Sequence, residues 1–221
     1  MIAPSHRRLA EIAGAAYDPA VPAFLERGDV KVTRTVLEGA VVFAHRGTRI
    51  RSSGDVTRDL DCVPIDRPGL GHLHAGFITG ALAVLEDLDA AIRSETLPVW
   101  LASHSLGAAM AIDTAGELTL RGIKLAGAVT FGCPRPGFST LAAVLRDLPG
   151  ADYRHGRDPV TEVPFGYWNA RPLVPLAAAA DEDRRSVSSI WSYVASLEAE
   201  CEDELRDHFI SGYIAALPAA A

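Results

Sequence analysis

The fold is decided by the stretch Leu97-Pro98-Val99-Trp100-Leu101-Ala102-Ser103-His104-Ser105-Leu106-Gly107-Ala108-Ala109-Met110. It begins as a short apolar run, is interrupted by Ser-His-Ser-Leu-Gly, and resumes as an alanine-rich run with helical spacing. This pattern predicts a strand, a sharp turn and a helix. Small residues flank Ser105 at the spacing of a nucleophile elbow, with Ser103 where that motif usually has its first glycine. An ordinary serine N-cap is the alternative explanation.

Strands and helices alternate on both sides of this stretch, which predicts an α/β domain with a mostly parallel central sheet flanked by helices. Apolar or β-branched runs predict strands over 30–36, 40–44, 98–102, 123–131, near 153 and over 172–176. Helical spacing predicts helices over 9–16, 74–93, 105–121, 138–148, 187–197 and 205–217. The segment 49–73 is expected to be irregular. No repeat or linker divides the chain, so residues 1–221 are expected to form a single domain.

The composition is typical of a globular protein, with 221 residues, 48% hydrophobic and 22% charged, and a net charge of −7. No basic block is present, which argues against a nucleic-acid partner. No stretch is long enough to span a bilayer, and residues 1–16 lack the apolar core of a secretory signal. A cytoplasmic location is expected, with export by another route left open. Three cysteines argue against a disulfide framework, although one bridge stays possible; they are Cys62, Cys133 and Cys201.

A serine nucleophile needs a base to accept its proton and an acid to orient that base. In this type of sheet the partners follow in the order serine, acid, histidine. After Ser105 the histidines are His155 and His208, and His208 follows every predicted strand. His155 lies three residues before Asp158 and is expected to be structural. Asp158 follows a predicted strand and is the favoured acid, with Glu162 as the second choice.

Each of these candidates also has an ordinary structural explanation. A half-buried helical histidine would account for His208, and a turn-forming aspartate would account for Asp158. His104 is adjacent to Ser105, but neighbouring side chains on such a turn diverge, so it is not favoured as the base.

An acyl-transfer site also requires hydrogen-bond donors for the oxyanion. The amide of Leu106 follows the candidate nucleophile and points into the site in an elbow of this kind. The second donor is expected from the loop after an early strand, where Gly47 allows close approach and Thr48 offers an amide and a hydroxyl. An ordinary strand exit is the alternative explanation of Gly47 and Thr48.

Several further motifs follow one another between about residues 40 and 215: His45-Arg46-Gly47-Thr48, Asp59-Leu60, His74-Ala75-Gly76-Phe77, Ser103 to Ala108, Thr130 to Gly137, Asp158-Pro159-Val160, and Asp207-His208 with Tyr213. In this order they resemble the class 3 (fungal-type) lipases of the α/β-hydrolase fold. The first resembles that family's aromatic-Arg-Gly-Ser/Thr segment. Ser103 and Ala108 stand where the family has glycines, which adds small side chains beside the elbow.

The resemblance implies a serine ester hydrolase of the lipase or esterase type, acting through an acyl-enzyme without metal or cofactor. It implies Ser105 as nucleophile, His208 as base and Asp158 as orienting acid. It also implies an oxyanion hole formed by Thr48 and Leu106, with Asp59 accepting the Thr48 hydroxyl. The expected partner is a small ester or a lipid, and the sequence leaves the oligomeric state open.

The segment 49–58 departs from the family, because it lacks the apolar helix that would dock on lipid. Only Ile50 and Val56 are strongly apolar in it, and Gly54 weakens a helix. We therefore expect weak interfacial activation and a preference for short or medium acyl chains.

Three alternatives stay open at this point. A phospholipase or acyltransferase would use the same triad. A non-catalytic α/β-hydrolase relative acting as a binding module would usually lack a triad residue, whereas all three positions are filled here. A metal enzyme using His72 and His74 is the third, although no carboxylate cluster lies nearby in the sequence.

Overall fold

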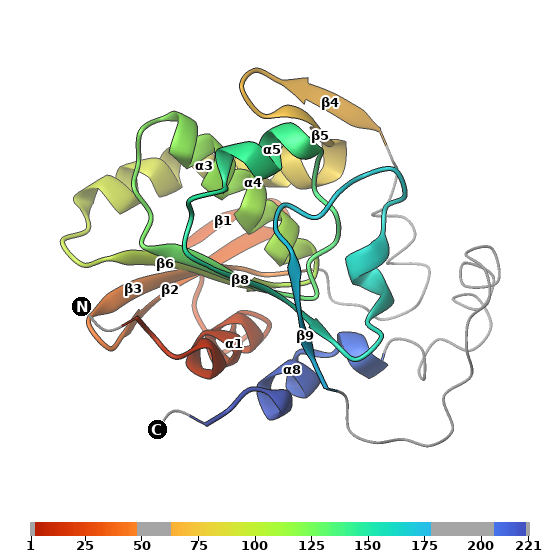
Figure 1. Cartoon of the computed structure of the whole chain (residues 1–221). Coiled ribbons are helices and arrows are strands. Elements are labelled where there is room, and N and C mark those ends of the chain that lie inside the picture. Colours follow the sequence, from red (N-terminus) through yellow and green to blue (C-terminus); the bar gives the residue numbers. More distant parts are fainter. Residues whose placement is uncertain (1–2, 48–62, 178–205, 220–221) are drawn as a thin grey trace.

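The computed structural model of the chain describes residues 3–47, 63–177 and 206–219 (Figure 1). Within these residues the main sheet is seven-stranded, in the order β1-β2-β3-β6-β7-β8-β9. Its strands are β1 (Leu25–Arg27), β2 (Val30–Leu37), β3 (Ala40–His45), β6 (Val99–His104), β7 (Gly127–Phe131), β8 (Gly150–His155) and β9 (Leu173–Leu176). In this sheet β1, β2 and β3 pair antiparallel, and β3, β6, β7, β8 and β9 pair parallel. The predicted mostly parallel sheet is confirmed.

Helices cover both faces of this sheet (Figure 1). One face carries α3 (Ala75–Ser94), α4 (Leu106–Leu120) and α5 (Ser139–Val144), and the other carries α1 (His6–Ala15) and α8 (Ile210–Ala216). Two short 3-10 helices, η1 (Pro159–Glu162) and η2 (Arg206–His208), follow β8 and precede α8. A strand covered on both faces is expected to be largely apolar, and β6, which begins with the apolar run 99–102, is buried at every residue.

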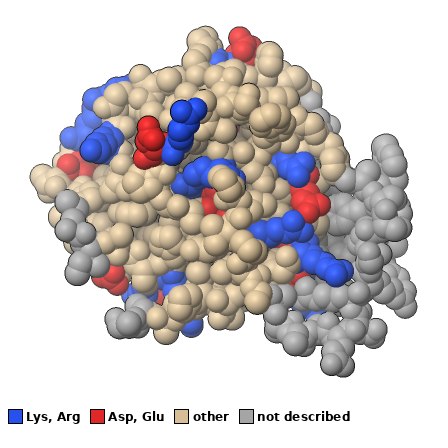
Figure 2. All heavy atoms as spheres, viewed as in Figure 1, with Lys and Arg blue, Asp and Glu red and all other residues tan. Residues whose placement is uncertain are grey.

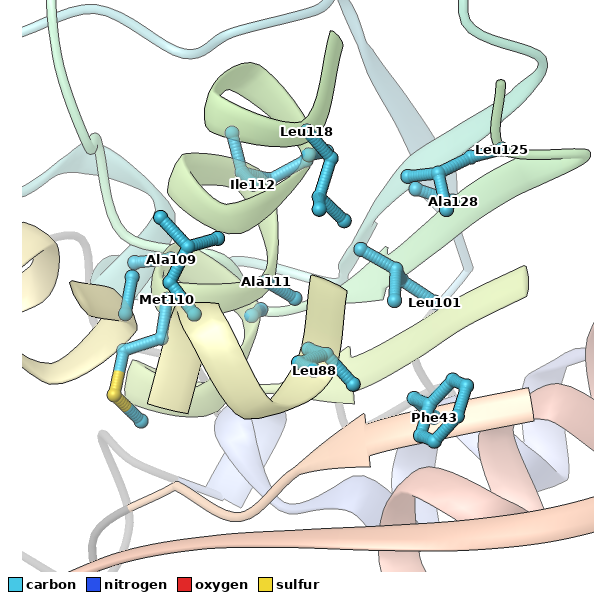
Figure 3. Close-up of a cluster of buried hydrophobic side chains, with 14 of the residues drawn as sticks. Phe43, Leu88, Leu101, Ala109, Met110, Ala111, Ile112, Leu118, Leu125 and Ala128 are labelled. Atoms are coloured by element: carbon cyan, nitrogen blue, oxygen red, sulfur yellow. The ribbon is translucent and has the colours of Figure 1, made fainter. Parts of the chain in front are cut away.

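The larger part of the core lies between α3, α4 and the sheet. Figure 3 shows Phe43 of β3 and Leu101 of β6 beside Leu88 of α3 and Ala111 of α4. Burial of a side chain such as Leu101 contributes roughly 1.5–3 kcal/mol to stability. The small residues of α4 let this helix lie close to the sheet. Because both β6 and α4 are packed in the core, the turn that joins them is held in place.

Several boundaries differ from the sequence-based predictions. The segment expected to be irregular contains an antiparallel hairpin of β4 (Pro64–Arg67) and β5 (Gly71–His74). Its short strands are punctuated by prolines and glycines, which hide the period-2 signal. The strand expected over 123–131 begins at Gly127, and the helix expected over 138–148 ends at Val144. The helix expected over 187–197 lies outside the described residues.

The helix expected over 205–217 is in fact two elements. Phe209 is extended, with φ −67° and ψ 133°, and separates η2 from α8. Apolar spacing alone does not reveal this break, because Phe209 and Tyr213 still fall at helical intervals. The consequence is that His208 is the last residue of the 3-10 helix η2 and does not lie inside an α-helix.

Charged side chains are interspersed on the surface. On the face in Figure 2, basic and acidic groups lie among a larger uncharged area. Among the described helices, none combines the length and apolarity needed to cross a membrane.

Candidate active site

The turn between β6 and α4 places Ser105 in an unusual backbone conformation. Ser105 has φ 58° and ψ −137°, where non-glycine residues are uncommon and cost on the order of 1–3 kcal/mol. Its amide donates to the carbonyl of Phe131 at 3.0 Å, which ties the turn to the end of β7. Ser105 occupies the N-cap position of α4, yet its side chain makes no capping hydrogen bond. The ordinary N-cap explanation of this serine is therefore wrong.

The hydroxyl of Ser105 instead meets the imidazole of His208. The distance from Ser105 Oγ to His208 Nε2 is 2.8 Å, and that from His208 Nδ1 to Asp158 Oδ2 is 2.9 Å. The three side chains come from the β6–α4 turn, from η2 and from the start of η1, and all are buried. With the proton on Nδ1, His208 donates to the carboxylate and can accept the serine proton at Nε2.

Asp158 is held in its ionised form by several donors. Its Oδ1 accepts the amide of Val160 at 2.9 Å, as a turn-forming aspartate would, and its Oδ2 also accepts the hydroxyl of Tyr213. Burial by itself would raise the pKa of Asp158, but His208, Tyr213 and the Val160 amide together lower it. Both explanations of Asp158, turn former and histidine partner, hold at once.

Tyr213 is the residue whose contact the sequence left unassigned. Its ring is fully buried, and burial followed by the charge of Asp158 raises the pKa of its hydroxyl well above the ordinary value. The hydroxyl thus stays protonated and donates a hydrogen bond to the Asp158 carboxylate. The sequence offered Tyr213 only as part of a motif, without a contact.

Gly132 lies directly against the Asp158–His208 pair. It follows β7 with φ +58°, a conformation that favours glycine. A Cβ atom there would lie 2.6 Å from Asp158 Oδ2 and 2.9 Å from His208 Nδ1. The absence of a side chain at this position lets the acid and the histidine meet.

The exit of β3 packs backbone to backbone against the start of α4. A Cβ on Gly107 would lie 2.2 Å from the carbonyl oxygen of His45 and 2.8 Å from the amide nitrogen of Gly47. Ser103, which stands at a family glycine, adds a tie here, because its Oγ accepts the amide of His45 at 2.9 Å. The chain leading to Thr48 therefore passes beside the turn.

The predicted oxyanion donors are only partly within the described structure. Leu106 begins α4, and the first amides of a helix have no partner inside the helix. Thr48 and Asp59 lie outside the described residues, as does the segment 49–58.

The remaining candidates lie away from the Ser105 hydroxyl. Glu162 pairs with Arg154 at 2.7 Å, and His155 Nδ1 contacts the carbonyl of Asp207 at 3.1 Å. His74 stacks on Phe77 with ring centroids 4.0 Å apart. In the described ranges, no three His, Cys, Asp or Glu side chains are grouped to hold a metal ion. Cys133 is a buried free thiol, while Cys62 and Cys201 lie outside the described residues.

Residues 42–168 match the family described as lipase (class 3). Among solved structures, the chain is similar to lipase II from Rhizopus niveus, with 26% identity over 78% of each chain and a TM-score of 0.64. It is also similar to Rhizomucor miehei triacylglyceride lipase, with 19% identity over 78% of each chain and a TM-score of 0.67. For the mono- and diacylglycerol lipase of Aspergillus oryzae the values are 19% identity, 81% and 80% coverage, and 0.61. No curated protein matches the chain in sequence.

Proposed function

Because the chain belongs to the class 3 lipase family, we propose that it hydrolyses carboxylic esters through an acyl-enzyme formed on Ser105. The fold is the α/β-hydrolase fold of the fungal lipases. One observation carries the proposal: Ser105, His208 and Asp158 are joined by contacts of 2.8 and 2.9 Å in a buried site.

The first half of the reaction forms the acyl-enzyme. Ser105 Oγ attacks the ester carbonyl carbon while His208 Nε2 accepts the hydroxyl proton. The negative charge that develops on the carbonyl oxygen is stabilised by the Leu106 amide and by Thr48, whose hydroxyl Asp59 accepts. As the C–O bond breaks, His208 returns the proton to the leaving alkoxide, and the alcohol departs.

The second half reverses these roles with water as the nucleophile. His208 takes a proton from water, the hydroxide attacks the acyl carbon, and the proton then passes to Ser105 Oγ as the carboxylic acid leaves. Asp158 stays ionised throughout. It holds the Nδ1–H tautomer of His208 and stabilises the imidazolium that forms in each half-reaction.

The proposed substrates are soluble esters with short or medium acyl chains. The support is the polar sequence of residues 49–58, which has no continuous apolar face for lipid. A chain-length series of p-nitrophenyl esters measures this preference. A sharp rise in rate above the solubility limit of tributyrin would contradict it, and product analysis with phospholipid or an acceptor alcohol would identify a phospholipase or an acyltransferase.

The decisive experiment is labelling with a fluorophosphonate probe, with the modified residue mapped by mass spectrometry. We expect the label on Ser105. Ser105→Ala should lose several orders of magnitude in p-nitrophenyl butyrate hydrolysis with little change in thermal unfolding. Ser139→Ala, at an exposed serine at the start of α5, is the matched control. Residual turnover of Ser105→Ala within about tenfold of wild type would remove Ser105 from this role.

A further inference from the structure

His104 is a buried histidine that the proposed reaction does not use. It ends β6 with 5% of its surface exposed, and it precedes Ser105 in the chain. Its ring lies beside that of His208, with centroids 4.7 Å apart and the planes inclined by 32°. Deeply buried polar groups are as a rule hydrogen-bonded, and both ring nitrogens of His104 have partners.

The two nitrogens of His104 contact two distant segments. Nε2 lies 2.6 Å from the carbonyl oxygen of His208, and Nδ1 lies 3.0 Å from the hydroxyl of Tyr17. A carbonyl can only accept, so Nε2 carries the proton and donates it. Nδ1 of the neutral ring is then an acceptor, and the Tyr17 hydroxyl donates to it at 3.0 Å, while the carbonyl oxygen of His104 is a second, more distant acceptor for the same hydroxyl at 3.3 Å.

The neutral state of His104 is secured by its surroundings. Burial, and then the neighbouring charge of His208, lower the pKa of His104 to about 3. When His208 takes up a proton during turnover, its charge opposes a second charge on His104. The direction of the hydrogen bonds is therefore the same in every step of the proposed reaction.

Tyr17 extends this series of hydrogen bonds to the residues that follow β3. Burial raises the pKa of the Tyr17 hydroxyl, and a hydrogen bond from the backbone of Gly47 partly offsets that rise. A Cβ on Gly47 would lie 2.2 Å from the Tyr17 hydroxyl oxygen, so the two are in close contact. One hydroxyl thus joins the residue before Thr48 to the ring that holds His208.

The turn η2 that carries His208 is held by the backbone at two successive carbonyls. His155 Nδ1 contacts the carbonyl of Asp207 at 3.1 Å, and His104 Nε2 contacts that of His208. The Asp207 carboxylate also accepts the amide of Arg157 at 2.7 Å. Of these ties, the bond from His104 reaches the backbone of the histidine itself.

We propose that Tyr17 and His104 are positioning residues, which align His208 with Ser105 through a directional chain of hydrogen bonds from the Gly47 amide to the His208 carbonyl. This inference rests on the proposed function. Neither residue touches the Ser105 hydroxyl, so both act through the placement of His208 and of the β3 exit. Tyr17 lies before the region that matches the family, which begins at residue 42.

Three substitutions test the chain of hydrogen bonds. Tyr17→Phe removes the donor to Nδ1, His104→Leu removes both bonds, and His104→Gln restores an N–H donor at about the reach of Nε2. Tyr153→Phe is the matched control, because the Tyr153 hydroxyl makes an equivalent bond of 2.8 Å to His6 Nδ1 outside this chain.

We expect kcat for p-nitrophenyl butyrate to fall about tenfold in Tyr17→Phe and about 100-fold in His104→Leu, with KM within about twofold of wild type. The rate of fluorophosphonate labelling of Ser105 should fall in parallel. His104→Gln should recover about tenfold of the loss in His104→Leu, and Tyr153→Phe should stay within about twofold of wild type. In ¹⁵N NMR spectra, His104 should be the Nε2–H tautomer in the wild type, and the Nδ1 resonance should shift in Tyr17→Phe because the hydrogen bond to that nitrogen is lost.

The outcomes separate this proposal from the proposed function. If Ser105 is not labelled in the wild type, the proposed function fails. If Ser105 is labelled and Tyr17→Phe reacts at the wild-type rate, only the positioning roles fail. A loss in His104→Leu that His104→Gln does not recover, or a change in KM alone, would also overturn them. Should His104→Leu not fold, Tyr17→Phe decides, because it deletes a single oxygen atom.

Discussion

Gly132→Ala offers the sharpest perturbation of the proposed site, because it adds one methyl group where the acid meets the histidine. Gly132 is not one of the three reacting side chains. It lies beneath Asp158 and His208, in the turn that leaves β7. The substitution changes no charge and removes no hydrogen bond.

The structure gives the magnitude of two separate effects. The φ of +58° at Gly132 is unfavourable for alanine, which costs roughly 1–2 kcal/mol of folding free energy. The new Cβ would also lie 2.6 Å from Asp158 Oδ2, 2.9 Å from His208 Nδ1 and 3.0 Å from His208 Cε1. Ordinary contact begins near 3.4 Å, so the two groups must move by about 0.4–0.8 Å. A displacement approaching 1 Å in a catalytic group can cost about 100-fold in rate.

The two effects are separated by a control with the same backbone conformation. Gly28 has φ +56°, and a Cβ there would meet nothing within 4 Å. Gly28→Ala and Gly132→Ala should therefore lose similar free energy from the backbone in urea denaturation. Only Gly132→Ala should lose kcat for p-nitrophenyl butyrate, by about 10- to 100-fold at saturating substrate.

The reasoning would be refuted by equal activity in the two variants. If kcat of Gly132→Ala stays within about threefold of Gly28→Ala, the Asp158–His208 contact does not limit turnover. A large loss of kcat in Gly28→Ala would equally show that backbone destabilisation, and not the overlap, governs activity.

Two further predictions concern the buried polar groups around the site. Tyr213→Phe removes the hydroxyl that Asp158 Oδ2 accepts, so we expect a loss of about 1–3 kcal/mol in urea denaturation and a higher pKa for Asp158; an unchanged unfolding free energy would contradict this. Burial lowers the pKa of His45 to about 4, so the folded chain binds fewer protons than the unfolded chain, whose histidines titrate near 6.5. His45 should therefore cost about 1.4 kcal/mol of stability per pH unit as pH falls from 6.5 towards 4, and His45→Phe should remove that slope; parallel stability curves for the two proteins would exclude the burial argument.

The order of the main strands and helices was predictable because local sequence patterns indicate them. Alternation in β2 and the continuous apolar runs of β3 and β6 identified strands, and the spacing of apolar residues identified α3. The short hairpin of β4 and β5 was missed, since four-residue strands interrupted by proline and glycine carry little periodicity. The break at Phe209 was missed for a related reason, because the apolar spacing continues across this residue although its backbone is extended.

For the candidate site, too, the sequence predicted one part and missed another. The order of Ser105, Asp158 and His208 along the chain and the small residues around the elbow made these residues candidates, and the ordered motifs that resemble the class 3 lipases selected them. Which groups surround them was not predictable: Tyr213 lies 55 residues from Asp158, and Tyr17 lies 87 from His104. Nothing in the sequence near any of these positions indicates its partner.

By itself, then, the sequence determined the strand-turn-helix at Ser105, the alternating α/β order, the family and the residues to examine. Only the tertiary structure decided that Gly132 makes room for the Asp158–His208 contact and that His104 holds the backbone of His208. The physical reason is the distance along the sequence over which each kind of information acts. Side-chain periodicity and turn chemistry act over a few residues, whereas a hydrogen bond depends on tenths of an ångström between segments that meet only when the sheet and its helices have packed.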